Sequence, residues 1–173
     1  LLYIIDRSML VMIIRTIKKE DNLIVKKIIQ ESLESLNFAI EGTAYFDPQL
    51  GRLNEYYDNL DNAKYWVVEL DNKIVGGIGI APFDNEQGIC ELQKLYLIPE
   101  AQGLGISKKL METALSFAST HYKSCYLETN HDLKVACILY EKFGFKLLNS
   151  PISGSGHFAM NAWYLKDLEV VNQ

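Results

Sequence analysis

The sequence lacks the patterns that mark disulfide-stapled or metal-binding proteins. Its 173 residues include 3 cysteines and no C-x-x-C pair, so it predicts neither a disulfide framework nor a zinc cluster. His121, His131 and His157 have no partner at a metal-ligand spacing, and we therefore expect no metal. We interpret the cysteines as reduced core thiols, which indicates a cytoplasmic protein.

Long apolar runs are also missing. Residues 1–11 are apolar, but Asp6 and Arg7 interrupt them, and the run is too short to cross a membrane. It also lacks a basic leader region and a signal-cleavage pattern. We expect an N-terminal extension over 1–11, either a tail or an oligomer contact, then one domain over 12–168 and a tail over 169–173.

An excess of positive charge is absent as well. With Lys+Arg 17 and Asp+Glu 22, the formal net charge is −5, which argues against sequence-independent nucleic-acid binding. Hydrophobic residues make up 49% and charged residues 23%, as in ordinary globular domains. The length suits one well-buried core, and the acidic balance favours a cationic partner such as an amine.

Two common phosphate-binding loops are missing too. No G-x-x-x-x-G-K-[ST] string occurs, and Gly103, Gly105 and Lys108 supply only the first two glycines of G-x-G-x-x-G. Even so, an apolar stretch over 89–98 reads as a strand that Pro99 ends. A glycine loop and an amphipathic helix follow, and a helix N-terminus after glycines suits a pyrophosphate. The alternative for this loop is a tight strand-to-helix connection.

Two motifs resemble one known family. Leu95-Tyr96-Leu97-Ile98-Pro99 followed by Gln102-x-x-Gly105-x-Ser107 is similar to motif A of the GNAT acyl-CoA-dependent N-acyltransferases. The segment Ala136-x-x-Leu139-Tyr140-Glu141-Lys142-Phe143-Gly144-Phe145 resembles the end of motif B. Ser107 departs from the usual Gly or Ala. The resemblance covers nearly the whole chain.

The hydrophobic periodicity predicts a mixed α/β fold in the order β-α-α-β-β-β-α-β-α-β-β, with helices on both faces of the sheet. The GNAT resemblance implies a mostly antiparallel sheet with a parallel pair at the cofactor site. The expected strands are 12–17, 65–70, 73–81, 89–98, 124–128, 145–148 and 158–165, and the expected helices are 21–36, 47–60, 106–118 and 132–143. Glycines at 76, 77 and 79 suggest a bulge or a close backbone approach.

The resemblance implies that acetyl-CoA is the cofactor. Backbone groups of the central strand would pair with its pantetheine arm, the Leu97 amide would polarise the thioester carbonyl, and loop amides would receive the pyrophosphate. The cofactor-binding residues predicted in this way are Leu95, Tyr96, Leu97, Gln102, Gly103, Leu104, Gly105, Ile106, Ser107 and Lys142. Asn130, at the end of the next strand, is a further candidate for bonding the cofactor or the acceptor, although the family's usual asparagine position is Leu133 here.

Acetyl transfer to an amine needs a base for the ammonium proton and an acid for the departing thiolate. Glu91, near the start of the central strand, matches the place where several GNAT enzymes carry a strand glutamate and is the candidate base. The alternative is a strand-face carboxylate paired with Lys94 or another neighbour. Tyr140 is the candidate acid by family analogy, and the alternative is a core tyrosine. Cys90 and Cys137 are weaker candidates, because direct transfer needs no covalent intermediate.

The GNAT resemblance implies that the segment 37–50, which is aromatic and acidic, lies over the acceptor site; the alternative is a packed helix-to-helix turn. Glu41 and Tyr45 from this segment, with His157 after a glycine-rich loop, are the candidate acceptor-binding residues. The predicted function is N-acetylation of a primary amine on a small molecule or peptide by a monomer or homodimer. A non-catalytic acyl-CoA sensor remains the alternative.

Overall fold

The computed structural model describes residues 2–5, 10–152 and 156–169, and in these it contains one sheet of eight strands. The strands follow the spatial order β1-β2-β3-β4-β5-β6-β8-β7. Their bounds are β1 Leu2–Ile5, β2 Leu10–Thr16, β3 Lys64–Leu70, β4 Lys73–Asp84, β5 Ile89–Leu97, β6 Ser124–Thr129, β7 Lys146–Leu147 and β8 Ala162–Asp167.

All neighbouring strands are antiparallel except β5 and β6, which are parallel. The predicted mixed α/β fold is therefore confirmed, with one strand more than expected. Residues 2–5 of the predicted extension form β1, and Leu2 lies opposite Ile13 of β2. Residues 1, 6–9 and 170–173 of the predicted extension and tail lie outside the described residues.

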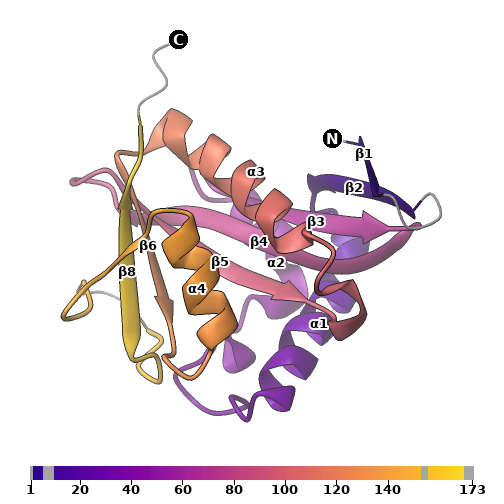
Figure 1. Cartoon of the computed structure of the whole chain (residues 1–173), viewed down its shortest axis with the longest axis horizontal. Helices are drawn as coiled ribbons and strands as arrows, with labels where there is room; N and C mark the ends of the chain where they lie inside the picture. The colour runs from indigo at the N-terminus through magenta and orange to yellow at the C-terminus, as the bar shows by residue number, and fades with distance from the viewer. Residues whose placement is uncertain (1, 6–9, 153–155, 170–173) are drawn as a thin grey trace.

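Helices cover both faces of the sheet, with α3 and α4 on the near face and α1 on the far face (Figure 1). Their bounds are α1 Asn22–Ser35, α2 Leu53–Asp58, α3 Ile106–His121 and α4 Lys134–Lys142. The helix predicted over 47–60 is shorter, because a 3-10 turn over Leu50–Arg52 precedes α2. Within the described residues, no helix is long and apolar enough to cross a membrane.

The two faces of the sheet carry separate cores. Leu110, Met111 and Ala114 of α3 are fully buried against one face, while Val25 and Ile29 of α1 are buried against the other. Burying a leucine or isoleucine side chain contributes about 1.5–3 kcal/mol, so each helix is held mainly by its apolar stripe.

The glycines of β4 let neighbouring groups approach closely, as their spacing predicted. A Cβ at Gly76 would lie 2.2 Å from the Tyr96 carbonyl oxygen, and one at Gly79 would lie 2.4 Å from the Tyr57 hydroxyl. The pairing of β4 with β5 also shifts register between Gly77 and Gly79. These positions therefore bring β5 and α2 close to β4 beside the site.

The last hairpin is shorter than predicted. Its second strand begins at Ala162 rather than at 158, because Phe158 lies in an exposed turn. The Asp71-Asn72 turn forms as expected, with φ of 49° and 63°, values that suit a tight hairpin. Gly144 ends α4 with φ of 84°, and its N–H donates to the Glu141 carbonyl.

Candidate active site

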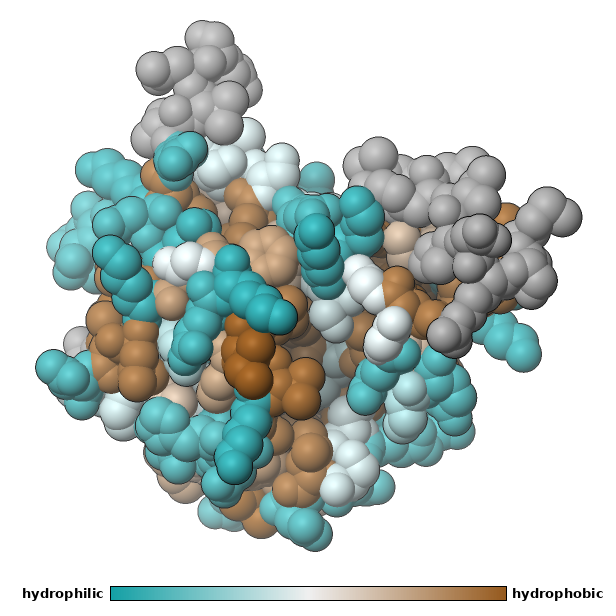
Figure 2. All heavy atoms as spheres, viewed as in Figure 1, coloured by the Kyte–Doolittle hydropathy of each residue, from teal (hydrophilic) through white to brown (hydrophobic). Residues whose placement is uncertain are grey.

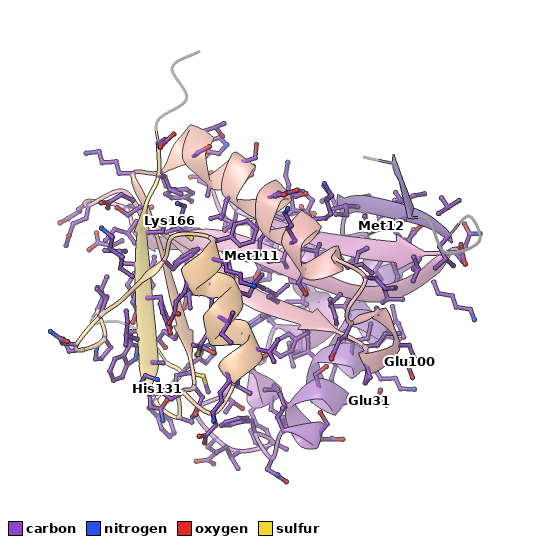
Figure 3. The ribbon with its side chains drawn as sticks, viewed as in Figure 1. Met12, Glu31, Glu100, Met111, His131 and Lys166 are labelled. Carbon is purple, nitrogen blue, oxygen red and sulfur yellow. The ribbon has the colours of Figure 1, made fainter. Side chains whose placement is uncertain are left out.

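The site lies where the two parallel strands separate. β5 and β6 pair from Ile89 to Glu91 opposite Ser124 to Tyr126, and no bridge joins the described residues of these strands beyond that point. The gap opens into a cleft of about 740 Å³ between β5, the end of β6, α4 and α1. Figure 2 shows apolar atoms near the middle of this face with hydrophilic residues around them. Glu31 of α1 also lines the cleft, and Figure 3 labels it at the lower right of the molecule, near Glu100 in this view.

A bulge in β5 shapes the floor of this cleft. Gln93 pairs with Gly79 and Tyr96 with Gly77, so β5 carries two intervening residues where β4 carries one. One of them, Lys94, has φ of 53°, in the left-handed region. Leu95, the other intervening residue, and Tyr96 and Leu97 after the bulge line the cleft, as predicted for the cofactor-binding strand.

The glycine loop lies at one end of the cleft. Gly103 and Gly105 both have φ of 75°, which glycine adopts without strain, and a Cβ at either would meet nothing within 4 Å. Gly105 is the N-cap residue of α3, whose first-turn amides have no partner within the helix. Gln102, Gly103 and Ser107 line the cleft, so the loop offers both open space and polar donors for an anion.

Leu104 and Ile106, two loop residues predicted to bind the cofactor, do not line the cleft with their side chains. Ile106 is fully buried, and Leu104 packs against the same core cluster, so their side chains anchor the loop instead of lining the cleft. Only their backbone amides, together with that of Gly105, remain available to a cofactor.

Tyr140 of α4 lines the cleft and is 8% exposed. Within the described residues, its hydroxyl has no hydrogen-bond partner, although its ring contacts those of Phe145 and Tyr164. Burial raises the pKa of the Tyr140 phenol well above its usual value, and the nearby Cys137 adds to this. The side chain therefore stays protonated at neutral pH and can donate a proton.

Glu91 of β5 also lines the cleft and is 9% exposed. Burial raises the pKa of its carboxyl, whereas a hydrogen bond from Gln93 Nε2 to Glu91 Oε2 at 2.6 Å acts in the opposite direction. The Tyr57 hydroxyl donates to Gln93 Oε1 at 2.8 Å and so fixes the amide. Of the predicted alternative pairings, the ion pair with Lys94 is not formed, because Lys94 pairs with Asp47, whereas Gln93 is the neighbour that bonds the carboxylate.

A second, smaller cavity of about 280 Å³ adjoins the cleft and shares Glu91, Gln93, Lys94 and His157 with it. The Lys94 ammonium is bonded to Asp47 Oδ2, and Asp47 Oδ1 lies 3.2 Å from His157 Nε2. Hydrogen bonds from His157 and Lys94 outweigh burial and hold the pKa of the Asp47 carboxyl below its usual value. The hydrogen bond to Asp47 raises the pKa of His157.

Glu128 of β6 completes the polar end of the site. One oxygen from each of Glu91 and Glu128 and a ring nitrogen of His157 all lie within 4.8 Å of one another. The Tyr126 hydroxyl donates to Glu128 Oε1 at 2.7 Å. These three residues are far apart in the sequence, so a search for ligands at short, regular spacings could not find this cluster.

Besides Leu104, Gly105 and Ile106 of the loop, four predicted site residues line neither cavity. Glu41 is exposed, and the Tyr45 hydroxyl donates to Glu34 Oε1 at 2.6 Å. Asn130 Oδ1 accepts the Asp132 N–H at 2.9 Å and shapes the turn before α4. Lys142 is exposed at the end of α4. The acceptor-binding and cofactor-binding roles assigned to these side chains are therefore not supported by their positions.

Sequence reasoning missed Asp47, Lys94, Gln93 and Glu128 as individual site residues. A lysine and a glutamine inside an otherwise apolar strand were an available signal, because buried polar groups need partners. Asp47 lies within the segment predicted to border the acceptor site, but its pairing across the chain has no local signature.

Comparison with known proteins identifies the family. Residues 28–145 match the model of the acetyltransferase (GNAT) family. An Escherichia coli K12 protein described as uncharacterized N-acetyltransferase YjgM is 38% identical over 159 residues, covering 90% of this chain and 95% of its own. The chain therefore belongs to the GNAT acetyltransferase family, and the predicted acetyl-CoA-dependent N-acetyltransferase is confirmed at that level.

Solved structures support the fold. A Staphylococcus aureus GNAT acetyltransferase superposes with a TM-score of 0.79 at 22% identity, covering 91% of this chain and 99% of its own. The Salmonella typhimurium acetyltransferase yncA, solved with its cofactor acetyl-CoA, gives a TM-score of 0.70 at 18% identity and covers 91% and 94%. The cleft fits this cofactor, because open glycine amides lie at one end and the free edge of β5 forms its floor.

Proposed function

We propose that the chain transfers the acetyl group of acetyl-CoA to a primary amine of a small molecule or peptide by direct attack in a ternary complex. The observation that carries the proposal is the placement of Glu91 and Tyr140 on one cleft, with a second polar cavity that shares Glu91 but not Tyr140. The larger cleft suits the cofactor and the smaller cavity suits the acceptor.

The bound cofactor supplies a thioester, whose acetyl group passes to the amine while the thiol is released. The amides of Leu95 to Leu97 and of the Gln102–Ser107 loop hold the cofactor, and the Leu97 amide polarises the carbonyl oxygen. Glu91 removes a proton from the ammonium, whose free pKa is about 10.4. Tyr140 donates its phenolic proton to the sulfur.

The charge where the two cavities meet supports an amine acceptor, because Glu91 lines both cavities and Glu128 lines the larger cleft. Glu91 and Glu128 place two carboxylates together, whereas Lys94 is already paired with Asp47. An arriving ammonium therefore meets two neighbouring carboxylates near its site of attack. We place this reaction in a single catalytic domain over 12–168, which acts as a monomer or homodimer. Because the three cysteines are free, we also propose that the protein is cytoplasmic.

The test is a thiol-release assay with acetyl-CoA against a panel of amines, polyamines, amino acids and peptides. Turnover on one class that falls sharply in Glu91→Gln supports the proposal and names the acceptor. Acetyl-CoA binding without release on any acceptor would instead favour the sensor function. The absence of acetyl-CoA binding would overturn the assignment of the Gln102–Ser107 loop.

A further inference from the structure

Three segments far apart in the sequence meet at Asp47. The aspartate comes from the segment between α1 and α2, Lys94 from the bulge of β5, and His157 from the connection before β8. A backbone bond from the Ala159 N–H to the Gly42 carbonyl at 3.1 Å joins the same two connections again. This double attachment fixes the position of His157 relative to β5.

The burial of these side chains forms a gradient. The Lys94 side chain is 2% exposed, Asp47 is 15% exposed and His157 is 27% exposed. Lys94 therefore holds Asp47 from the buried side of the cluster, and the imidazole of His157 lies on its solvent side. Because the buried ammonium needs its carboxylate partner, this ion pair holds Asp47 in place.

Glu91 lies deeper than the imidazole. A base buried to this degree must pass its proton outward before the next cycle, because a neutral Glu91 cannot accept another. His157 is within 4.8 Å of a Glu91 oxygen, a span that one water molecule or a small side-chain rotation bridges. It also lines both cavities.

We propose that the Asp47–His157 pair is the proton exit of the acceptor site: His157 takes the proton that Glu91 removes from the amine, and Asp47 holds and stabilises the resulting imidazolium. This inference rests on the proposed function. The balance is complete, because the ammonium loses one proton to Glu91, which passes it to neutral His157, and the imidazolium releases it to solvent. The nitrogen loses its second proton as the amide forms, and that proton replaces the one that Tyr140 gives to the sulfur. Asp47 and Lys94 are positioning residues, since neither touches the reacting atoms.

The charges around His157 determine its pH dependence. Asp47 from the segment before α2, Glu91 from β5 and Glu128 from β6 favour the imidazolium, whereas Lys94 opposes it. The phenol of Tyr56 from α2 lines the same cavity. Because the relay needs neutral His157, the rate should rise with pH through the pKa of the imidazole.

The experiment compares wild type, His157→Gln, Asp47→Asn and the control His131→Gln on an amine that the wild type acetylates. His131 is exposed beyond the end of β6 and lines neither cavity (Figure 3). We expect His157→Gln to lower kcat at least about tenfold with the acceptor KM changed less than about threefold, and added imidazole to restore part of the rate. His131→Gln should match the wild type.

Asp47→Asn should move the acidic limb of the kcat profile to lower pH by about one unit, because the imidazolium loses its carboxylate partner. Imidazole NMR titration without acceptor should report the same shift. A His157→Gln variant within about twofold of wild type overturns the inference, as does a lowered rate that imidazole does not restore. If Asp47→Asn does not fold, His157→Gln and its rescue decide alone. A wild type inactive on every amine would instead count against the proposed function.

Discussion

The Tyr140→Phe variant separates catalysis from stability. The substitution removes only the hydroxyl, which has no hydrogen-bond partner within the described part of the chain and belongs to a mostly buried side chain that lines the cleft. No hydrogen bond is lost, so the free energy of unfolding should change by less than about 0.5 kcal/mol. The thiolate in turn loses its proton donor, which should lower kcat by about 10²–10⁴-fold.

The matched control is Tyr164→Phe in the same aromatic cluster. Its ring lies 6.2 Å from that of Tyr140, but its hydroxyl donates to Glu141 Oε1 at 3.2 Å. This variant should lose about 0.5–1.5 kcal/mol of stability and keep its kcat. The pair is thus expected to respond oppositely in the two measurements.

Urea unfolding followed by fluorescence gives the stabilities, and thiol release with saturating acetyl-CoA gives kcat. The raised pKa of Tyr140 adds a further check, since an acid with a pKa above 10 should leave the kcat profile without an alkaline limb below about pH 10. A Tyr140→Phe enzyme that retains a third or more of the wild-type kcat would refute the assignment of this phenol as the acid.

Three further predictions concern the base and the glycines. Glu91→Gln should lower kcat about 10²-fold or more, and activity equal to the wild type would contradict this. The variant should be at least as stable as the wild type at pH 7, because a carboxyl with a raised pKa is less favourably ionised in the folded state than in the unfolded state. For the same reason the wild-type kcat/KM should fall as the pH drops through the raised pKa of Glu91, at a pH above the usual value of about 4.3, which a pH–rate series measures. Gly105→Ala should lower the free energy of unfolding by about 1–2 kcal/mol, because Gly105 has a positive φ, and it should raise the KM for acetyl-CoA. The control Gly51→Ala should change neither quantity, since a Cβ at Gly51 meets nothing within 4 Å and its φ is not positive.

The parts of the site that are local in the chain were predictable. The strand, the glycine loop and the helix that starts after Gly105 follow one another directly, and the positive φ at Gly105 is a property of that residue type. Tyr140 lies within a contiguous motif for the same reason. Their placement on one cleft follows from the parallel pairing of β5 with β6.

The acceptor end depends on contacts between distant segments. Asp47 and His157 are 110 residues apart, and their pairing depends on how two irregular connections pack over β5. The left-handed φ of Lys94 could not be predicted from the sequence either, because lysine seldom adopts this conformation and only the bulge requires it. The turn that Asn130 forms has a local signal, because asparagine side chains often accept the backbone N–H two residues further on.

The strands at the two margins of the sheet are short, with four residues in β1 and two in β7. An unpaired margin is a template on which another chain can add a strand, and short marginal strands reduce this risk of aggregation. Without β1, the seven-residue β2 would become the margin. A chain shortened by residues 1–9 should therefore self-associate at lower concentration in light scattering, while its distant catalytic cleft remains unchanged.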